Sequence, residues 1–277
     1  MNGGDLLYLT SYAESTVKTY DWPGLGHRQT LKGFTQEEGL CTDKKGNVFV
    51  ANLGGNNIVE YAHGGEKPIA TLNDLAGYQP DSCAVDPVSG DLAVTNLAYY
   101  VSGTGMANVV IFRHATGHPR PYTIPTIYSY YMCGYDDRGN LIVDGFGAGS
   151  HAKAGFAILP HGAQHLRKLT LDPEPAGPGG IQWDGKYWAI GDTGSTIYRF
   201  DVTGSKGTKV GTTTLQESST IFEFFIYGDR VIAPEHETSG LRAGRQAQVF
   251  NYPAGGAAIG SIHGLNLPFG AVVSHGI

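Results

Sequence analysis

The chain has 277 residues, of which 16% are charged, and its formal net charge at pH 7 is −6. This balance argues against a nucleic-acid partner, because no basic stripe exists to neutralise phosphates. No apolar run approaches the ~20 residues that cross a bilayer, so we expect no membrane span.

Taken in chain order, the sequence repeats one pattern six times. The pattern starts weakly at residues 5–24 and is clearest at 39–65, which contain GLCTDKKGNVFVAN and then NIVEYAHGG. A repeat of about 40–50 residues with several short strands is typical of a β-propeller. The further copies occupy 82–117, 132–163, 180–204 and 224–256.

Each copy divides into short strands joined by tight turns. In the second copy, GLCTD, VFVAN, NIVEYA and PIATL are separated by turns such as KKGN and HGG. Gly and Asn in these turns accept positive φ at little cost, and no long amphipathic pattern interrupts the strands. We therefore predict an all-β fold, a six-bladed β-propeller whose blades are four-stranded and antiparallel.

The two chain ends are expected to complete one blade. The first copy lacks an inner strand, and LPFGAVVS at 267–274 matches the inner-strand pattern without outer strands after it. Pairing the two closes the ring and leaves no open sheet edge. We expect one domain over 1–277 and a monomer. The predicted blades are 267–274 with 5–34, then 35–76, 77–127, 128–174, 175–218 and 219–264.

Three cysteines, Cys41, Cys83 and Cys133, lie in three consecutive predicted inner strands. Measured back from the Asp of the following turn, Cys41 is out of step with the other two, so it points to the opposite face of its strand. The favoured interpretation is three small buried side chains near the axis. A Cys41–Cys83 disulfide and a metal–thiolate site are the alternatives, and the latter lacks CxxC spacing.

Polar side chains gather at one end of the predicted axial channel, where inner strands begin and second strands end. Carboxylate and amide oxygens from several blades suit a hard cation and are costly to crowd together without one. We predict one divalent cation there, Ca²⁺ or Zn²⁺. The alternative is that these residues cap strand ends and bind water. The predicted ligands are Glu38, Asn52, Asp81, Asn96, Asp144 and Asp192.

The same face carries candidate catalytic residues. Glu235, His236 and Glu237 form the densest ionisable cluster in the chain. A histidine between carboxylates can act as general acid or base near neutral pH, although many loop histidines are only solvated. The candidate catalytic residues are Glu223, Glu235 and His236.

Aromatic side chains at this face are candidates for ligand binding. Tyrosines offer flat apolar walls with hydroxyl tips, which suit sugars and other cyclic molecules. Packing between blades is the competing interpretation. Three insertions, 97–107, 146–154 and 236–245, are longer than the other turns and extend over this face. The candidate ligand-binding residues are Tyr99, Tyr100, Tyr130, Tyr131, His151 and Phe222.

The units DKKGNVFVANLGGNNIVEYAHGG and DDRGNLIVDG resemble those of NHL-type propellers and their relatives, the gluconolactonase-like (SMP-30-like) and streptogramin-lyase-like proteins. In the lactonases a Glu at an inner-strand entrance holds one divalent metal with Asn and Asp from other blades. The resemblance implies Glu38, Asn96 and Asp192 as counterparts, although the first blade has Phe269 at its entrance. In the streptogramin-lyase-like enzymes, His and Glu residues near the axis carry out the chemistry. The resemblance implies Glu235 and His236 as loose counterparts of these residues.

Three functions are open at this point. The first is a metal-assisted, lactonase-like hydrolase or lyase acting on a small cyclic substrate in the axial pocket. The second is a non-catalytic propeller that binds a glycan, peptide or protein through its aromatic rim, and the third is a structural extracellular module. The chain opens with MNGGD, without a signal-peptide pattern. We expect a secreted or periplasmic bacterial protein whose leader has been removed, with a cytoplasmic protein as the alternative.

Overall fold

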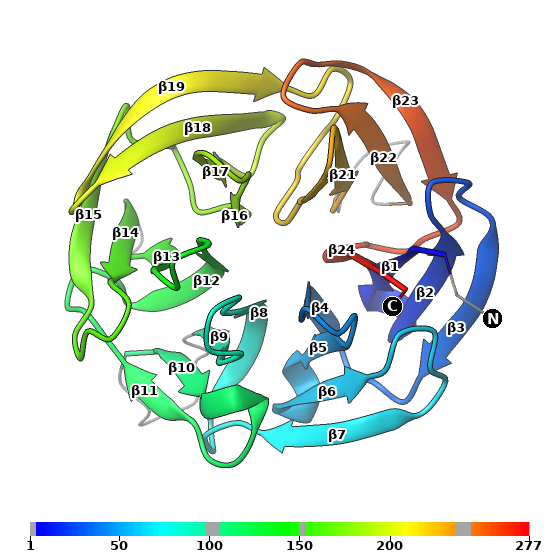
Figure 1. Ribbon diagram of the computed structural model, residues 1–277, viewed down its shortest axis with the longest axis horizontal. Helices are drawn as coiled ribbons and strands as arrows, with labels where there is room; N and C mark the ends of the chain where they lie inside the picture. The colour runs from blue at the N-terminus through cyan, green and yellow to red at the C-terminus, as the bar shows by residue number, and fades with distance from the viewer. Residues whose placement is uncertain (1–3, 98–105, 150–152, 237–244, 277) are drawn as a thin grey trace.

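The strands of the protein form sheets that stand radially around a central axis, which is the arrangement of a β-propeller (Figure 1). The structure is a computed structural model that describes residues 4–97, 106–149, 153–236 and 245–276. Within these residues the helical segments are short 3₁₀ turns, η1 (Tyr12–Glu14), η2 (Leu53–Gly55) and η3 (Arg113–Ala115). No helix in the described part is long and apolar enough to cross a membrane.

The sheet that joins the chain ends has the order β24-β1-β2-β3. The last strand pairs antiparallel with the first, with Leu6 opposite Ser274 and Leu9 opposite Ala271. The prediction that the C-terminal segment supplies the innermost strand is therefore confirmed, although the strand is shorter than 267–274. The bounds are β1 (Leu6–Ser11), β2 (Thr16–Asp21), β3 (His27–Lys32) and β24 (Ala271–Ser274).

Three more sheets have four strands each and run outward from the axis in chain order. The first contains β4 (Glu37–Thr42), β5 (Val48–Asn52), β6 (Asn57–Tyr61) and β7 (Pro68–Asn73). The second contains β8 (Gln79–Val85), β9 (Leu92–Leu97), β10 (Val109–Phe112) and β11 (Arg120–Tyr122). The third contains β20 (Phe225–Tyr227), β21 (Arg230–Pro234), β22 (Gln246–Asn251) and β23 (Gly255–His263).

The remaining strands form one eight-stranded sheet, which differs from the separate four-stranded blades that we expected. Two antiparallel groups of four meet along their outermost strands, β15 and β19, which pair in parallel from Thr170 opposite Lys206 to Asp172 opposite Thr208. Gly207 permits this approach, because a Cβ there would come within 2.6 Å of the Leu171 side chain. The bounds are β12 (Ser129–Tyr135), β13 (Leu141–Phe146), β14 (Ala154–Leu159), β15 (Arg167–Asp172), β16 (Ile181–Trp183), β17 (Trp188–Gly191), β18 (Thr196–Thr203) and β19 (Lys206–Thr214).

An Asp directly follows each of the inner strands β4, β8, β12 and β16, and it explains why the chain turns there. In the β4–β5 turn, Asp43 Oδ1 accepts hydrogen bonds from the backbone amides of Lys45 and Asn47, both at 2.8 Å. Asp136 accepts the equivalent pair in the β12–β13 turn. An Asp side chain that bonds its own backbone two residues on favours such a turn.

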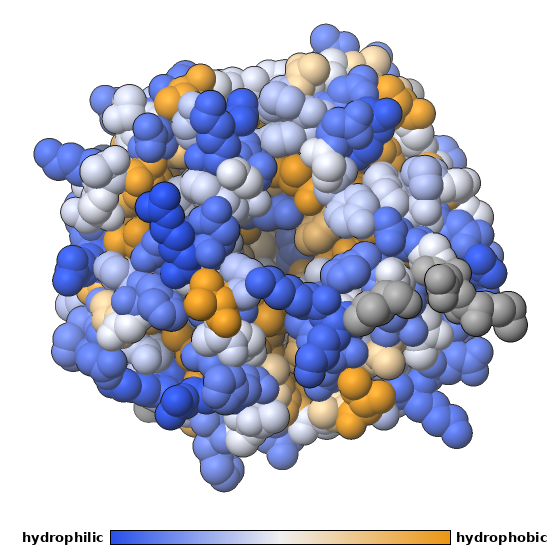
Figure 2. Space-filling view, viewed as in Figure 1, coloured by the Kyte–Doolittle hydropathy of each residue, from blue (hydrophilic) through white to orange (hydrophobic). Residues whose placement is uncertain are grey.

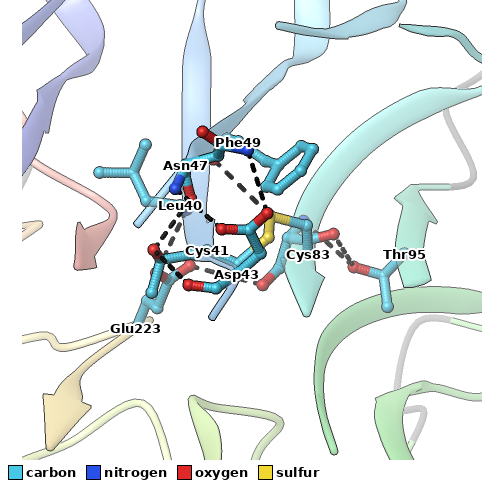
Figure 3. Close-up of a disulfide and its surroundings, with 10 residues drawn as sticks. Leu40, Cys41, Asp43, Asn47, Phe49, Cys83, Thr95 and Glu223 are labelled. Atoms are coloured by element: carbon cyan, nitrogen blue, oxygen red, sulfur yellow. Dashed lines mark hydrogen bonds between the residues drawn. A yellow bond between two sulfur atoms is a disulfide. The ribbon is translucent and has the colours of Figure 1, made fainter. Parts of the chain in front are cut away.

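A disulfide joins the innermost strands of two neighbouring sheets (Figure 3). Cys41 on β4 and Cys83 on β8 are bonded, with their Cα atoms 5.6 Å apart. Cys133 is a buried free thiol. The favoured interpretation of three free thiols is therefore wrong for two of them. The reason is the offset seen in the sequence: the two side chains point toward each other from facing strands.

Candidate axial site

The axial channel has two ends with different chemistry. We call the end at which the inner strands begin the entrance end, and the end that carries the β4–β5 and β8–β9 turns the turn end. Glu38, Asp81 and Tyr131 lie near the beginnings of β4, β8 and β12, so neighbouring sheets place them together at the entrance end. Glu38 is 8% exposed and Asp81 is 1% exposed. These carboxyls are the starting point of the site.

Oε2 of Glu38 and Oδ2 of Asp81 are buried, and neither has a hydrogen-bond partner in the described chain. Burial raises the pKa of Glu38 to about 7. Burial first, and then the charge of Glu38, raises the pKa of Asp81 well above its usual range. Burial therefore favours the neutral form of both carboxyls.

Asp144 and Glu223 are also buried near the axis, but their carboxyl oxygens accept hydrogen bonds from backbone amides. Asp144 Oδ1 accepts from the Met132 amide at 2.8 Å and its Oδ2 accepts from the Gly179 amide at 2.9 Å. Glu223 Oε1 accepts from the Leu40 amide at 3.3 Å. Burial raises the pKa of both carboxyls to about 8, against the lowering effect of these bonds.

Gly39 lets the inner strands of neighbouring sheets come close beside these carboxyls. A Cβ at Gly39 would lie 2.6 Å from Ser82 Cα, 2.7 Å from the Asp81 carbonyl and 2.8 Å from Glu223 Oε2. Two of these atoms belong to the backbone, so they cannot move aside without shifting a strand. Gly39 is therefore needed for the close approach of the two inner strands at the entrance end.

Three further predicted metal ligands make hydrogen bonds near the ends of strands. Asn52 Oδ1 accepts from the Thr35 amide at 2.7 Å. Asn96 Nδ2 donates to Asn108 Oδ1 at 2.9 Å. The two carboxylate oxygens of Asp192 accept from the Gly194 amide and the Tyr198 hydroxyl, both at 3.1 Å.

Four of the six predicted ligands, Asn52, Asn96, Asp144 and Asp192, are engaged in hydrogen bonds within the described chain. In the described ranges no group of three or more His, Cys, Asp or Glu side chains is placed to hold a metal ion. The physical reason is that strand ends leave peptide N–H groups, and short polar side chains satisfy them. Of the predicted carboxylate ligands, Glu38 and Asp81 are the ones whose oxygens are not occupied by a peptide donor from the described chain.

The candidate catalytic residues at the sixth copy of the repeat have different surroundings. Glu235 is 2% exposed, and its carboxylate accepts hydrogen bonds from Ser218 Oγ at 3.3 Å and Gln246 Nε2 at 2.8 Å. His236 is half-buried, and burial lowers its pKa against the opposing effect of hydrogen bonds to the Pro268 and Leu267 carbonyls. Its Nδ1 has no partner among the described residues.

Aromatic rings surround His236 at the entrance end. Phe222 and Phe269 are stacked with centroids 5.4 Å apart. The His236 ring meets them edge-on at 5.3 and 5.7 Å, and it also meets Tyr12 at 6.0 Å. Across the channel, Tyr131 packs edge-on against Phe146 at 5.6 Å. These rings come from three different sheets.

The predicted ligand-binding tyrosines divide into two groups. Tyr131 is half-buried at the entrance end, as Phe222 is. Tyr130 is fully buried, and its hydroxyl accepts from the Ile124 amide at 2.8 Å. Its assignment to the rim is corrected, because neighbouring strand residues point to opposite faces and Tyr130 faces the core. Tyr99, Tyr100 and His151 lie outside the described residues.

Phe269 and Tyr12 were not among the predicted site residues. The repeat pattern contains a signal for both, since Phe269 occupies an inner-strand entrance and Tyr12 follows the end of a second strand. We define the entrance cluster as Glu38, Asp81, Tyr131, Phe222, His236 and Phe269.

The cavities along the axis lie toward the other end. One of about 140 Å³ is lined by Cys41, Cys83 and Cys133 together with other inner-strand residues. It shares Thr42 and Val85 with a cavity of about 680 Å³ at the turn end. Figure 2 shows a hollow near the centre of the face in view. The prediction placed all candidate residues at the entrance end and did not include this space.

Solved structures with the same arrangement of sheets are known. A chain of a nidogen/laminin complex aligns with a TM-score of 0.74 and 14% identity, over 98% of this chain and 98% of that one. A protein of unknown function from Bacteroides caccae aligns with a TM-score of 0.71 and 9% identity, over 98% and 99%. A chain of hydrazine synthase from Kuenenia stuttgartiensis aligns with a TM-score of 0.67 and 14% identity, over 90% and 81%.

No family model matches the chain, and no curated protein matches its sequence. Structural likeness at such low identity establishes the fold and says nothing of the chemistry. The chain therefore has a β-propeller fold, which it shares with a chain of a nidogen/laminin complex and a chain of hydrazine synthase.

Proposed function

We propose that this protein is a ligand-binding β-propeller that holds a small polar molecule at the entrance cluster. The observation that carries the proposal is the convergence of two kinds of group there. Oε2 of Glu38 and Oδ2 of Asp81 are buried without a partner in the described chain, and Phe222 and Tyr131 present partly exposed rings at the same end of the axis. Buried polar groups without partners call for an explanation, and a bound molecule supplies one.

We further propose that the strands make six blades in a single domain. The eight-stranded sheet counts as two blades, because its two antiparallel groups of four join only through the outer β15–β19 pair. A relationship to the NHL-type and gluconolactonase-like propellers belongs to the same proposal. The repeated sequence pattern and the overall arrangement of the sheets support this relationship.

The binding proposal is tested by ligand-observed NMR with a library of small polar and cyclic molecules, sugars included. We expect hits whose signals are lost with Phe222→Ala and kept with Ile69→Ala. Ile69 is a suitable control because it is 56% exposed on the outer strand β7, away from the axis. A library without hits, or hits that survive Phe222→Ala, would contradict the proposal. One structural neighbour belongs to a protein–protein complex, so a protein partner is then the next class to test.

A second candidate is a hydrolase or lyase acting at the same cluster. Two features favour it: burial raises the pKa values of the carboxyls of Glu38 and Asp81, and Nδ1 of His236 has no partner in the described chain. A carboxyl pair with separated pKa values can divide the roles of acid and base. A lactone and ester screen tests this candidate, with and without added Ca²⁺ or Zn²⁺. Turnover that disappears with Glu38→Gln would support it, and no turnover on any substrate would contradict it.

We propose a secreted or periplasmic location. The Cys41–Cys83 disulfide supports it, since disulfides form and persist mainly in oxidising compartments. Mass spectrometry of the protein taken directly from its native cells, with free thiols blocked, tests the idea. A reduced Cys41–Cys83 pair would contradict it.

A further inference from the structure

The arginines of the described chain differ in whether they have a carboxylate partner. Arg28, Arg199 and Arg230 each form an ion pair with an aspartate. Most of the other described arginines line two neighbouring cavities, and none of these makes an ion pair within the described residues. They are Arg113, Arg120, Arg138 and Arg167.

The two cavities lie on either side of β14, at the turn end of the propeller. The first has a volume of about 350 Å³, lies between the sheet β8–β11 and the strands β12–β15, and contains Arg113 and Arg120. The second has a volume of about 580 Å³, lies between the two halves of the eight-stranded sheet, and contains Arg138 and Arg167. Pro160 lines both cavities, so they are adjacent across three consecutive groups of four strands (Figure 1).

Each cavity also has an aromatic ring. In the first, the Arg120 guanidinium lies 5.1 Å from the centroid of the Tyr122 ring, and its Nη1 donates to Gln164 Oε1 at 2.6 Å. Arg120 is therefore held in place with other N–H groups left over. In the second, the half-buried Trp183 meets Trp188 edge-on at 5.6 Å. A cyclic ligand could pack against either ring.

Carboxylates line the same cavities, and they limit how densely charged an anionic ligand can be. Asp86 and Asp136 each accept from the peptide amide two residues further on, at 2.8 and 2.9 Å, so they are engaged in their own turns. Asp201 is exposed at the second cavity and accepts no hydrogen bond from the described residues. A chain as densely charged as a nucleic acid would be repelled by these groups. A ligand with spaced carboxylates and hydroxyl groups would not.

A uronic-acid sugar combines the features that these cavities match. Its carboxylate suits the fork of a guanidinium group, which binds such anions through two parallel hydrogen bonds. Its ring suits the faces of Tyr122 and Trp183, and its hydroxyls are donors for Asp201. An acidic peptide also offers carboxylates, but it lacks hydroxyl-bearing rings. The acidic sugar is therefore the better match.

We propose that the two cavities together bind an acidic polysaccharide built of uronic-acid rings. Arg113 and Arg120 receive one carboxylate of the chain, and Arg138 and Arg167 receive another. The site is separate from the entrance cluster and goes beyond the proposed function. A single ring reaches only one of the two arginine pairs, so joining rings in one chain raises the affinity.

Calorimetry with hexagalacturonate, the galacturonate monomer and the neutral maltohexaose tests the requirement for charge and for chain length. We expect hexagalacturonate to bind at least about tenfold more tightly than either comparison, the usual worth of one charge-assisted contact. Arg120→Gln and Arg167→Gln should each weaken it by a similar factor. Lys168→Gln is the matched control, because Lys168 is the next exposed residue of β15 and lines neither cavity.

Phe222→Ala separates this site from the entrance cluster and should leave the affinity for hexagalacturonate unchanged. Loss of binding in Phe222→Ala would overturn the inference, as would equal weakening by Arg167→Gln and Lys168→Gln. Equal affinity for maltohexaose, or no binding of hexagalacturonate at millimolar concentration, would also overturn it. Hexaglutamate binding more tightly than hexagalacturonate would overturn the polysaccharide and indicate an acidic peptide partner.

Discussion

His63 and Ser274 are hydrogen-bonded at 2.7 Å although 211 residues separate them in the chain. Ser274 ends the last strand, and its hydroxyl donates to the Gly46 carbonyl in the β4–β5 turn. The C-terminal strand is therefore fixed on two sides, by its pairing with β1 and by this contact with the next sheet.

Removing the Ser274 hydroxyl should weaken ring closure. Ser274→Ala leaves buried groups on Gly46 and His63 without a partner, which costs about 1–3 kcal/mol of unfolding free energy. Ser205→Ala is the control, because Ser205 is exposed in the β18–β19 turn and should change stability by less than about 0.5 kcal/mol. Urea unfolding measures both. Equal stability of the two variants would show that the contact is not part of closure.

Deleting residues 271–277 should have a larger effect than any substitution in that strand. The deletion removes the innermost strand of its sheet and exposes the edge of β1. We expect loss of the cooperative unfolding transition in circular dichroism. A truncated chain that melts like the full one would refute closure by β24.

A second disulfide should form one sheet further along. Ala84 occupies in the third repeat the position that Cys41 occupies in the second, and Cys133 stands to Ala84 as Cys83 stands to Cys41. Ala84 and Cys133 already belong to one buried cluster. Ala84→Cys should therefore bond to Cys133, and non-reducing peptide mapping would detect the new link. Two free thiols in the oxidised variant would show that the β8–β12 interface is spaced differently.

A methyl group at Gly39 should strongly destabilise the protein. The new Cβ would meet backbone atoms of Ser82 and Asp81 at 2.6 and 2.7 Å, so the strands must separate. We expect Gly39→Ala to cost at least about 1–3 kcal/mol, as overpacking of a core does. Gly147→Ala should be mild, since its new Cβ would lie 3.5 Å from the Thr126 carbonyl, an ordinary contact. Thermal unfolding of the pair measures the difference, and similar melting temperatures would contradict the close approach.

Stability should fall as the pH rises from about 4.5 to about 8. Burial raises the pKa values of Asp144 and Glu223 to about 8, so between these limits the folded protein binds more protons than the unfolded chain. Each extra bound proton then lowers the unfolding free energy by up to about 1.4 kcal/mol per pH unit. Urea unfolding at pH 5, 6.5 and 8 measures the slope. Glu223→Gln should flatten it, and stability that rises over this range would contradict the assignment.

The sequence predicted those features of the fold that depend on residues within a single repeat. The Asp-containing turns, the closing strand at the C-terminus and the placement of Glu38 and Asp81 at one end of the axis follow from a sequence pattern that recurs about every 40–50 residues. The repeated sequence pattern does not predict which outer strands of neighbouring copies pair with each other. The parallel pairing of β15 with β19 depends on Gly207, which the repeat does not mark.

Hydrogen-bond partners of the site residues were the least predictable part. Asp81 and Asp144 are both predicted metal ligands, yet Asp144 accepts two peptide N–H groups, whereas Oδ2 of Asp81 has no partner in the described chain. The difference arises from the neighbouring sheet, which a single repeat cannot show. The same limit applies to Tyr130, whose burial depends on the strand register at the bulge between Tyr130 and Cys133.

The location of the ligand site is the central claim, and aromatic NMR tests it most directly. Ring resonances of Phe222 and Tyr131 report the entrance end, and those of Phe225 and Tyr227 report the cavity of about 680 Å³ at the turn end. The account predicts that the first ligand found by screening shifts Phe222 and Tyr131 and leaves Phe225 and Tyr227 unchanged. Shifts confined to Phe225 and Tyr227 would contradict it and move the site to the opposite end of the channel.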